Sequence, residues 1–547
     1  MAVNYTEEQL NSVDKSFLIQ LLLQQQEQLN ALTKELHTSN EKMQLLMEQV
    51  ILGKQNRFGR SSEKMEDTSQ ICFCEVDGTI VFFNEAEAVC DLNAAEPDDL
   101  ELKSPKQPKR KGKKEADLSG LPVRRIDHYL SEEELEAEFG VRGWKQLPDA
   151  ISRKYHFVPA KVEVEEHHIG VYASKTDEHM VKADHPKALL HGSLVSPSLG
   201  AAIINGKYVN AVPLYRLEQE FQRYGLQITR QNMANWCIRL AEEYLSVLYD
   251  HLHKVLYSYH VIHADETPVL VNHDGRKAGS KSWMWVYRSG FMYPEKQIIL
   301  YEYQKTRNAS HPREFLKNYS GICVTDGCQV YHTLEKEKED LKIAGCWVHC
   351  RRKFHDALEV IPKDLRKQSV LYLIMNQIRA IYREEGKLSG LSSDERTAKR
   401  QLVVKPLVDA FFAYLKQNSD RVPKSGKTKE AFTYALNQER YLRVFLENGD
   451  VPMDNNASER AIRGFCIGKK NWEMIDTVNG ATSSAIIYSI AETAKANQLK
   501  PYEYFEYLLT EIPKHMDDKN SNFLEELLPW SETLPENIRK PEKTDEK

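Results

Sequence analysis

The sequence predicts an α/β protein whose strands are preceded, interrupted and followed by helical segments. Three observations indicate this class. Short apolar or alternating runs bounded by turn residues predict strands between positions 261 and 348. A nearly continuous helical pattern fills residues 362–448. An apolar heptad pattern runs through the first sixty residues.

The composition is that of an ordinary globular protein. The chain has 547 residues, a length that predicts about three to five domains. The hydrophobic fraction is 41%, which is ordinary for a globular protein. No apolar run reaches the ~18 residues that a membrane helix needs. Nine scattered cysteines and the lack of a signal-peptide pattern favour a cytoplasmic protein without a membrane partner. The net charge of −6 argues against a uniformly basic nucleic-acid coat, but it allows a DNA enzyme with clustered basic residues.

Residues 1–64 are predicted to form a helix that pairs protomers as a coiled coil. Apolar residues recur at steps of three and four: Leu18, Leu22, Leu29, Leu32, Leu36, Met43, Leu46 and Val50. An amphipathic helix packed on its own domain is the alternative. The narrow stripe and the Gln/Glu/Lys-rich flanks favour a homo-oligomer.

Residues 65–118 are predicted to be a variable segment and charged linker. Seven acidic residues at positions 85–101 precede seven basic residues at positions 103–114, a composition that cannot bury a core. A flexible spacer and an arm that grips phosphate groups fit it equally well. Residues 119–190 are predicted to form a small β segment, because the sequence from about 155 to 172 alternates.

Residues 191–255 are predicted to be a helical DNA-binding region. A helix from Pro213 is broken at Gly225, and Thr229 can cap a second helix that runs to Leu240. This is a helix-turn-helix pattern, although helix pairs of this kind also occur in purely structural settings. The candidate DNA-reading side chains on the second helix are Arg230 and Gln231.

Strands and helices then alternate in a pattern typical of a mixed core. Strands are expected at 261–271, 282–288, 297–303, 321–325 and 343–348, with helices near 312–319 and from His349. No clear strand is expected after residue 448. The core is therefore predicted in two parts, residues 256–361 and 449–495, which flank the helical segment 362–448; a C-terminal helical region and tail, residues 496–547, follows.

Three acidic residues are candidates for catalysis. Asp265 lies on an apolar strand, Asp326 follows the end of another, and Glu459 lies just inside a helix start. A carboxylate on an apolar strand is costly unless it is paired or binds a cation. Three such groups could hold Mg²⁺ for phosphoryl transfer. Each could instead be a surface or capping carboxylate. Strand alternation predicts that Glu266 points away from the face of Asp265.

Basic and metal-ligating residues surround these acids in the sequence. The candidate phosphate-binding cations are Arg351, Arg352, Lys353, Arg460, Arg463, Lys469 and Lys470. Cys346 and His349 lack a second ligand pair for zinc, so a buried cysteine and a hydrogen-bonded histidine are expected there. Trp472 could stack on an unpaired base, but a core position is the simpler interpretation.

Several long motifs occur in one order along the chain. They are Arg57-Phe-Gly-Arg-Ser-Ser-Glu-Lys64, His263-Ala-Asp265-Glu-Thr267, Thr325-Asp326-Gly327, Gly345-Cys-Trp-Val-His349-Cys-Arg-Arg352, and Asp454-Asn-Asn-Ala-Ser-Glu459-Arg-Ala-Ile-Arg463 followed by Gly468-Lys-Lys-Asn-Trp472. With these motifs the chain resembles, nearly end to end, the bacterial transposases of insertion-sequence family sixty-six.

The resemblance implies a DDE transposase with a ribonuclease-H-like core. Its catalytic and metal-binding triad would be Asp265, Asp326 and Glu459, separated by 61 and 133 residues, with a helical insertion in the longer gap. It implies Mg²⁺, with Mn²⁺ as the alternative ion, and a structural role for Cys346 and His349. The implied partners are DNA, both element ends and target, and small accessory proteins of the same element.

One departure concerns zinc. The family carries a cysteine-rich zinc-binding segment before the helix-turn-helix, but residues 91–236 contain no cysteine here. The segment 119–190 is therefore predicted to be a degenerate equivalent of that domain, and zinc is not expected. Two other functions remain open: a catalytically inactive, transposase-derived DNA-binding protein, and a ribonuclease-H-like nuclease without strand transfer. The presence of all three acids disfavours the first.

Overall fold

The computed structural model describes residues 72–76, 79–83, 125, 129–140, 160–173, 178, 180–184, 187–277 and 279–541. The predicted coiled coil and the two charge blocks lie outside these described residues. A smaller unit within residues 49–155 carries the hairpin β1–β2 (Cys72–Val76 and Thr79–Phe83) and α4 (Glu132–Phe139). The larger unit covers residues 156–540 and contains all the other described elements discussed below.

A mixed sheet forms the centre of the larger unit, which agrees with the predicted α/β class. Its strand order is β7–β6–β5–β8–β9, and the short β10 pairs with the far end of β5. Strands β5, β6 and β7 are antiparallel neighbours, whereas β8, β9 and β10 run parallel to β5. The bounds are β5 Val261–His273, β6 Lys281–Ser289, β7 Ile299–Gln304, β8 Gly321–Thr325, β9 Leu341–Gly345 and β10 Ile475–Thr477.

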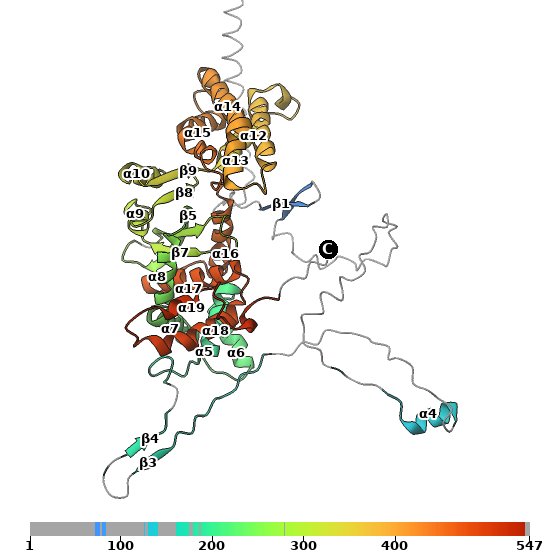
Figure 1. Cartoon of the computed structure of the whole chain (residues 1–547), viewed down its shortest axis with the longest axis vertical. Coiled ribbons are helices and arrows are strands. Elements are labelled where there is room, and N and C mark those ends of the chain that lie inside the picture. Colours follow the sequence, from blue (N-terminus) through green and yellow to red (C-terminus); the bar gives the residue numbers. More distant parts are fainter. Residues whose placement is uncertain are drawn as a thin grey trace, which may run out of the picture. The chain divides into compact units, whose positions relative to one another are not determined.

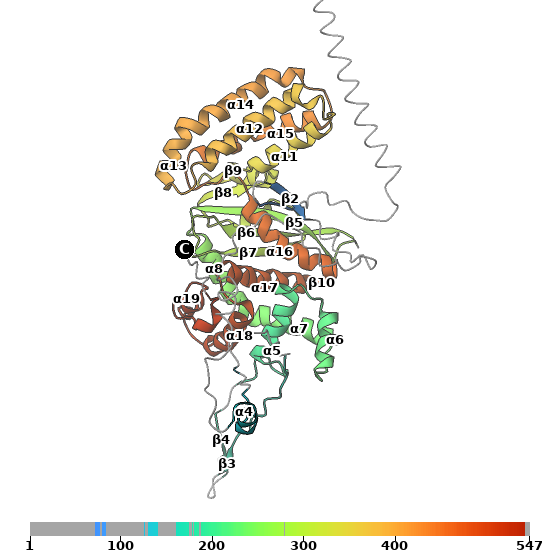
Figure 2. The ribbon, with the colours of Figure 1, turned by 90° about the vertical axis from the view of Figure 1, so that its right-hand side faces the viewer.

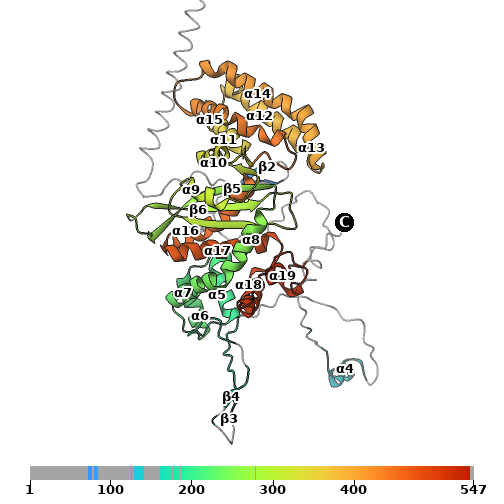
Figure 3. The ribbon, with the colours of Figure 1, turned by 60° about the vertical axis from the view of Figure 1, so that its left-hand side comes forward.

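Helices gather beyond both edges of this sheet (Figures 1 and 2). Those beyond β9 are α12 Val370–Gly386, α13 Ser393–Lys399, α14 Lys405–Asn418 and α15 Lys427–Leu442. Those beyond β7 are α5 Pro197–Ile204, α6 Leu214–Arg223, α7 Arg230–Leu240, α8 Ser246–Leu256, α17 Val478–Ala496, α18 Pro501–Glu511 and α19 Phe523–Leu527 (Figure 3). Nearer the sheet are α9 Ser310–Phe315, α10 Gln329–Glu337, α11 Trp347–Glu359 and α16 Asn456–Trp472. A separate hairpin is β3 Val171–Ala173 with β4 Met180–Lys182.

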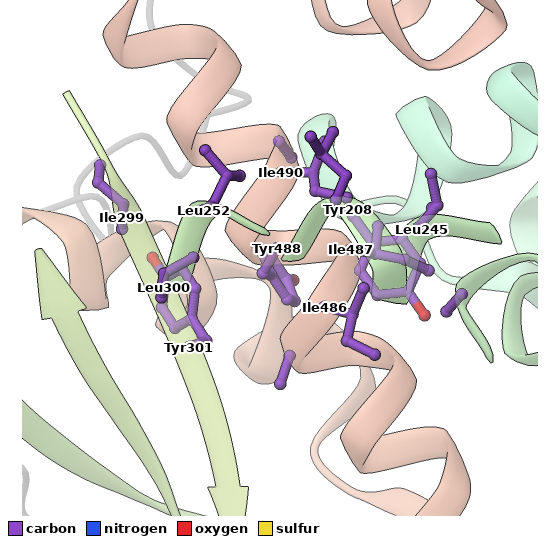
Figure 4. Close-up of a cluster of buried hydrophobic side chains, with 14 of the residues drawn as sticks. Tyr208, Leu245, Leu252, Ile299, Leu300, Tyr301, Ile486, Ile487, Tyr488 and Ile490 are labelled. Carbon is purple, nitrogen blue, oxygen red and sulfur yellow. The ribbon is translucent and has the colours of Figure 1, made fainter. Parts of the chain in front are cut away.

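Two hydrophobic clusters hold these layers together. One joins α11, α12, α14 and α15 to one face of β5, β8 and β9, with Trp347, Phe411 and Phe412 at its centre. The other joins β6 and β7 to the helices beyond β7. Figure 4 shows Tyr301 of β7 and Tyr488 of α17, whose ring centroids lie 5.9 Å apart. Apolar burial of this extent is the main stabilising contribution to the fold.

Helix α17 also satisfies the open edge of β7. The backbone N–H of Tyr301 donates to Ser489 Oγ at 2.7 Å, and that of Ile299 donates to Thr493 Oγ1 at 2.9 Å. Thr493 Oγ1 donates back to the Ile299 carbonyl at 3.0 Å. An unpaired strand edge invites association with other chains, so these hydroxyls close the sheet against such pairing.

The structure confirms most predicted elements of the core and corrects three. The second helix of the predicted pair begins as expected: Thr229 Oγ1 accepts the N–H of Asn232. The strand expected at 343–348 is β9, Leu341–Gly345, because Trp347 begins α11 and buries its ring in the core. The helix expected at 312–319 is α9, Ser310–Phe315. The expectation of no late strand was wrong, since β10 extends the sheet with three residues.

Candidate active site

The sheet register brings Asp265 and Asp326 together. In the parallel β5–β8 pair, Val261 lies opposite Ile322 and His263 opposite Val324. The same offset of 61 separates Asp265 on β5 from Asp326, the residue directly after β8, and the charge of Asp326 raises the pKa of Asp265. Strand alternation puts Asp265 on the sheet face that also carries Val261. The 61 residues between the two acids in the sequence therefore equal the register offset of the β5–β8 pair.

Glu459 reaches the same face from the first turn of α16. Its side chain is 23% exposed, and its Oε1 lies 3.8 Å from His349 Nε2 on α11. Arg352 Nη2 lies 4.0 Å from the other carboxylate oxygen. Arg288 of β6 fixes this turn by donating from Nη1 to the Ala457 carbonyl at 3.0 Å.

Asn455 anchors the start of α16 between two elements of the sheet. It is fully buried, and its Nδ2 donates to the Ala264 carbonyl at 2.9 Å. Because that nitrogen is the donor, Asn455 Oδ1 accepts from His263 Nδ1 at 2.8 Å, and burial lowers the pKa of His263 to about 4. The backbone N–H of Asn455 donates to Cys346 Sγ at 3.3 Å.

Cys346 and His349 have different surroundings, and only Cys346 takes part in this hydrogen-bond network. Burial raises the pKa of the Cys346 thiol to about 12, so it is a neutral acceptor in the anchor of α16. His349 instead faces Glu459, and its Nδ1 is buried without a hydrogen-bond partner among the described side chains. Desolvation lowers the pKa of His349, with Asp326 and Glu459 acting against this. The predicted structural role suits the contacts of Cys346 better than those of His349.

The electrostatics of the three carboxylates favour a cation. Burial raises the pKa of Asp265 well above its usual value, and the negative charges of Asp326, Glu266 and Glu459 raise it further. Glu459 Oε1 has no hydrogen-bond partner in the described part of the chain. Hard carboxylate oxygens of this kind suit Mg²⁺. Within the described residues, however, no three His, Cys, Asp or Glu side chains are grouped closely enough to hold a metal ion.

Glu266 belongs to the opposite face of the sheet, as alternation predicts. Arg307 pairs with it, and its Nε donates to Glu266 Oε1 at 2.7 Å. Burial and the charge of Asp326 raise the pKa of Glu266 to about 7, although Arg307 opposes this rise. The two adjacent acids therefore have different surroundings. Glu266 is paired with the Arg307 guanidinium, whereas Asp265 lies near the carboxylates of Asp326 and Glu459.

The predicted cations of α11 border the carboxylates. Arg351 and Arg352 are exposed, and Arg352 is the one near Glu459. The Arg351 guanidinium lies 5.6 Å from the Tyr382 ring centroid, and the Lys353 ammonium lies 5.3 Å from that of Tyr434. Such cation–aromatic contacts hold long side chains at fixed positions while their charge stays accessible.

The other predicted cations are more dispersed. Arg460, Arg463 and Lys470 are exposed on α16, whereas Lys469 donates to the Pro268 carbonyl at 2.9 Å and so is tied to β5. Arg230 and Gln231 are exposed in the first turn of α7, beyond the β7 edge, so the structure does not bring them to the carboxylates (Figure 1). Trp472 is partly buried against the larger hydrophobic cluster, in agreement with a core position.

Some side chains that contact the candidate site were not predicted from the sequence. Tyr434 of α15 donates its hydroxyl to the Asp326 carbonyl at 3.0 Å. The sequence around Tyr434 does not predict this hydrogen bond, because its two partners are 108 residues apart. Asn455 and His263 lie inside motifs noted above, but only the fold shows that they bond to each other.

Comparisons with known proteins identify the chain. A model described as "Transposase IS66 family" matches residues 192–483, which is more than half of the chain. Models described as "IS66 C-terminal element" and "Transposase C of IS166 homeodomain" match residues 489–530 and 45–126. The matched regions place the chain among transposases, a class that acts on DNA. It belongs to the IS66 transposase family.

Relatives from Sinorhizobium fredii share most of this length. "Uncharacterized protein y4qI" is 28% identical over 389 residues, which cover 70% of each chain. "Uncharacterized protein y4jD" is 27% identical over 397 residues, which cover 71% of this chain and 76% of the relative. In the described part of the present chain, no helix is long and apolar enough to cross a membrane.

Proposed function

We propose that the protein is a DDE transposase that binds the ends of its insertion sequence, cleaves phosphodiester bonds there and joins the 3′-OH ends to target DNA. The observation that carries this proposal is the closeness of three carboxylates. Asp326 directly follows β8, the parallel neighbour of the strand that carries Asp265, and the charges of Asp326 and Glu459 both raise the pKa of Asp265. The mixed sheet with helices packed around it is compatible with a ribonuclease-H-like core.

In this proposal Asp265, Asp326 and Glu459 hold Mg²⁺, with Mn²⁺ as the alternative ion. When bound, the metal supplies activation of an attacking oxygen and stabilisation of a leaving oxygen. Protein side chains have the other tasks. Asn455 keeps the turn that carries Glu459 against β5, and Arg352 and Lys353 bind DNA phosphates beside the carboxylates.

The remaining regions receive roles from the family resemblance. Residues 1–64 would pair protomers, 65–118 would link them to the rest, and 119–190 would be a zinc-free remnant of the family's zinc-binding domain. Residues 191–255 would read DNA, while 256–361 and 449–495 would form the core around the helical insertion 362–448. Residues 496–547 would form the C-terminal helical region and tail. Small proteins from the same element would assist.

The decisive experiment incubates the full chain and Mg²⁺ with DNA that carries the element ends and a target plasmid. We expect cleaved ends and joined products. Glu459→Gln should remove both, because it takes a charge from the triad. Glu503→Gln is a matched control, since Glu503 also lies in the first turn of a helix, α18. Binding without cleavage would support the inactive-protein alternative, and cleavage without joining would support the nuclease.

DNA binding should depend steeply on salt, and the α11 cations should account for part of this dependence. For Arg352→Gln combined with Lys353→Gln, we expect the slope of log affinity against log salt to fall by about two, because each phosphate contact contributes roughly 0.9. Fluorescence anisotropy over a series of KCl concentrations measures this slope. Lys519→Gln, which removes an exposed cation of the C-terminal region, should leave the slope unchanged. If the double variant has the same slope as the wild-type protein, Arg352 and Lys353 do not contact DNA phosphates.

A further inference from the structure

Helix α15 holds the turn that carries Asp326. The Tyr434 hydroxyl donates to the Asp326 carbonyl at 3.0 Å. The next residue, Gly327, has φ +91°, and a Cβ there would meet Tyr434 Oη at 3.1 Å and Gln438 Oε1 at 3.2 Å. A side chain is therefore excluded at position 327 by the backbone conformation and by the closeness of α15.

The contact belongs to a continuous stripe along α15. Tyr434, Gln438 and Tyr441 follow at helical spacing and lie on one face of the helix. Tyr441 stacks on His332 of α10, with ring centroids 3.8 Å apart. A Cβ at Gly345, the last residue of β9, would lie 3.2 Å from Tyr441 Cβ. The stripe thus runs along the carboxyl ends of β8 and β9, where the site is built.

The surroundings of Tyr434 fix both its protonation and its place. Burial raises the pKa of its hydroxyl, so the group stays protonated and acts as a donor. The Lys353 ammonium lies over its ring. One turn later, Gln438 is only 8% exposed, and its Oε1 has no hydrogen-bond partner among the described residues. Buried polar groups without a hydrogen-bond partner are few in native structures.

The orientation of the Asp326 carboxylate depends on this turn. Asp326 Oδ1 accepts the backbone N–H of Cys328 at 3.2 Å, which closes a tight turn just after β8. If the Asp326 carbonyl were released, the peptide that follows it could rotate, and the carboxylate would move with it. Displacements of about 1 Å in a reacting constellation are enough to reduce rates strongly.

We propose that Tyr434 is a positioning residue for Asp326, so that the helices beyond β9 complete the active site. The inference rests on the proposed function for its consequence in catalysis, but the positioning itself can be tested without DNA. Tyr434 acts through the Asp326 peptide and does not touch the substrate. Gln438 supports it by filling the space beside Gly327.

The test compares Tyr434→Phe with Tyr414→Phe in the full chain. Both remove one hydroxyl from a partly buried tyrosine beyond the β9 edge, and both should melt within about 3 °C of wild type. Hydrogen–deuterium exchange of the metal-free protein follows the Cys328 amide. We expect it to exchange roughly threefold to tenfold faster in Tyr434→Phe alone, the factor that one lost hydrogen bond corresponds to.

Mn²⁺ binding, followed by electron paramagnetic resonance, gives a second readout. We expect Tyr434→Phe to weaken it by a similar factor, and Asp326→Asn to weaken it more. Unchanged exchange at Cys328, or the same change in Tyr414→Phe, would overturn the inference even if the protein cleaves DNA normally. A chain that fails to cleave DNA, but shows the selective exchange change, would contradict the proposed function and leave the positioning role intact.

Discussion

Asp265→Asn should reduce DNA cleavage in Mg²⁺ by at least about a hundredfold, whereas Glu266→Gln should leave it within about threefold. The first substitution removes a carboxylate ligand from the group of acids that includes Asp326 and Glu459. An amide is a weaker ligand for a hard divalent cation than a carboxylate is. The loss should therefore appear in the chemical step.

Glu266 is the best available control, because it adjoins Asp265 on the same strand but faces the other way. Its partner is Arg307, and its pKa is raised to about 7, so it is partly protonated at neutral pH already. A neutral glutamine of the same shape resembles that form. Single-turnover cleavage of end-bearing DNA measures both variants. Equal losses in the two would show that the strand merely needs its buried acids for folding.

Asn455→Ala should destabilise the protein by about 2–5 kcal/mol, the largest effect that we expect from a single side chain away from the carboxylates. The substitution leaves the Ala264 carbonyl and His263 Nδ1 buried without their partner. Each unsatisfied buried group costs about 1–3 kcal/mol. It also frees the first turn of α16, so cleavage should fall even under conditions where the chain remains folded.

The next residue provides the comparison. Asn456 begins α16 and is only partly buried, so Asn456→Ala should change the free energy of unfolding by less than about 1 kcal/mol. Urea denaturation followed by circular dichroism measures both variants. If Asn455→Ala is as mild as Asn456→Ala, the contacts of Asn455 with β5 do not hold α16 in place.

Local signals made much of the fold predictable. Strand β8 was predicted to the residue because its apolar run is bounded by Gly321 and by Asp326. Thr229 marked the start of α7 because a threonine side chain can accept an N–H of the following turn. Where apolar residues continue past a strand end, as at Trp347, composition does not distinguish buried strand from buried helix, and the boundary was misplaced.

Long-range contacts explain what the sequence did not reveal. The pairing of Asn455 with His263 crosses 192 residues, and that of Tyr434 with Asp326 crosses 108. Neither has a periodic or compositional signature, since each depends on the packing of helices against strand ends. The three acids could be named because motifs surround them. The side chains that bond to the segments carrying these acids became visible only in the fold. The coiled coil remains a prediction.

The late position of α16 in the chain bears on how the protein comes into being. Strands β5 and β8 can pair once residue 325 has left the ribosome, but the Asn455 anchor and Glu459 are synthesised more than a hundred residues later. Domains form as their residues emerge. A nascent or truncated chain that ends before α16 would therefore carry a sheet, two of the three acids and an exposed core face. Under the proposed function, cleavage could therefore begin only after α16 has been synthesised.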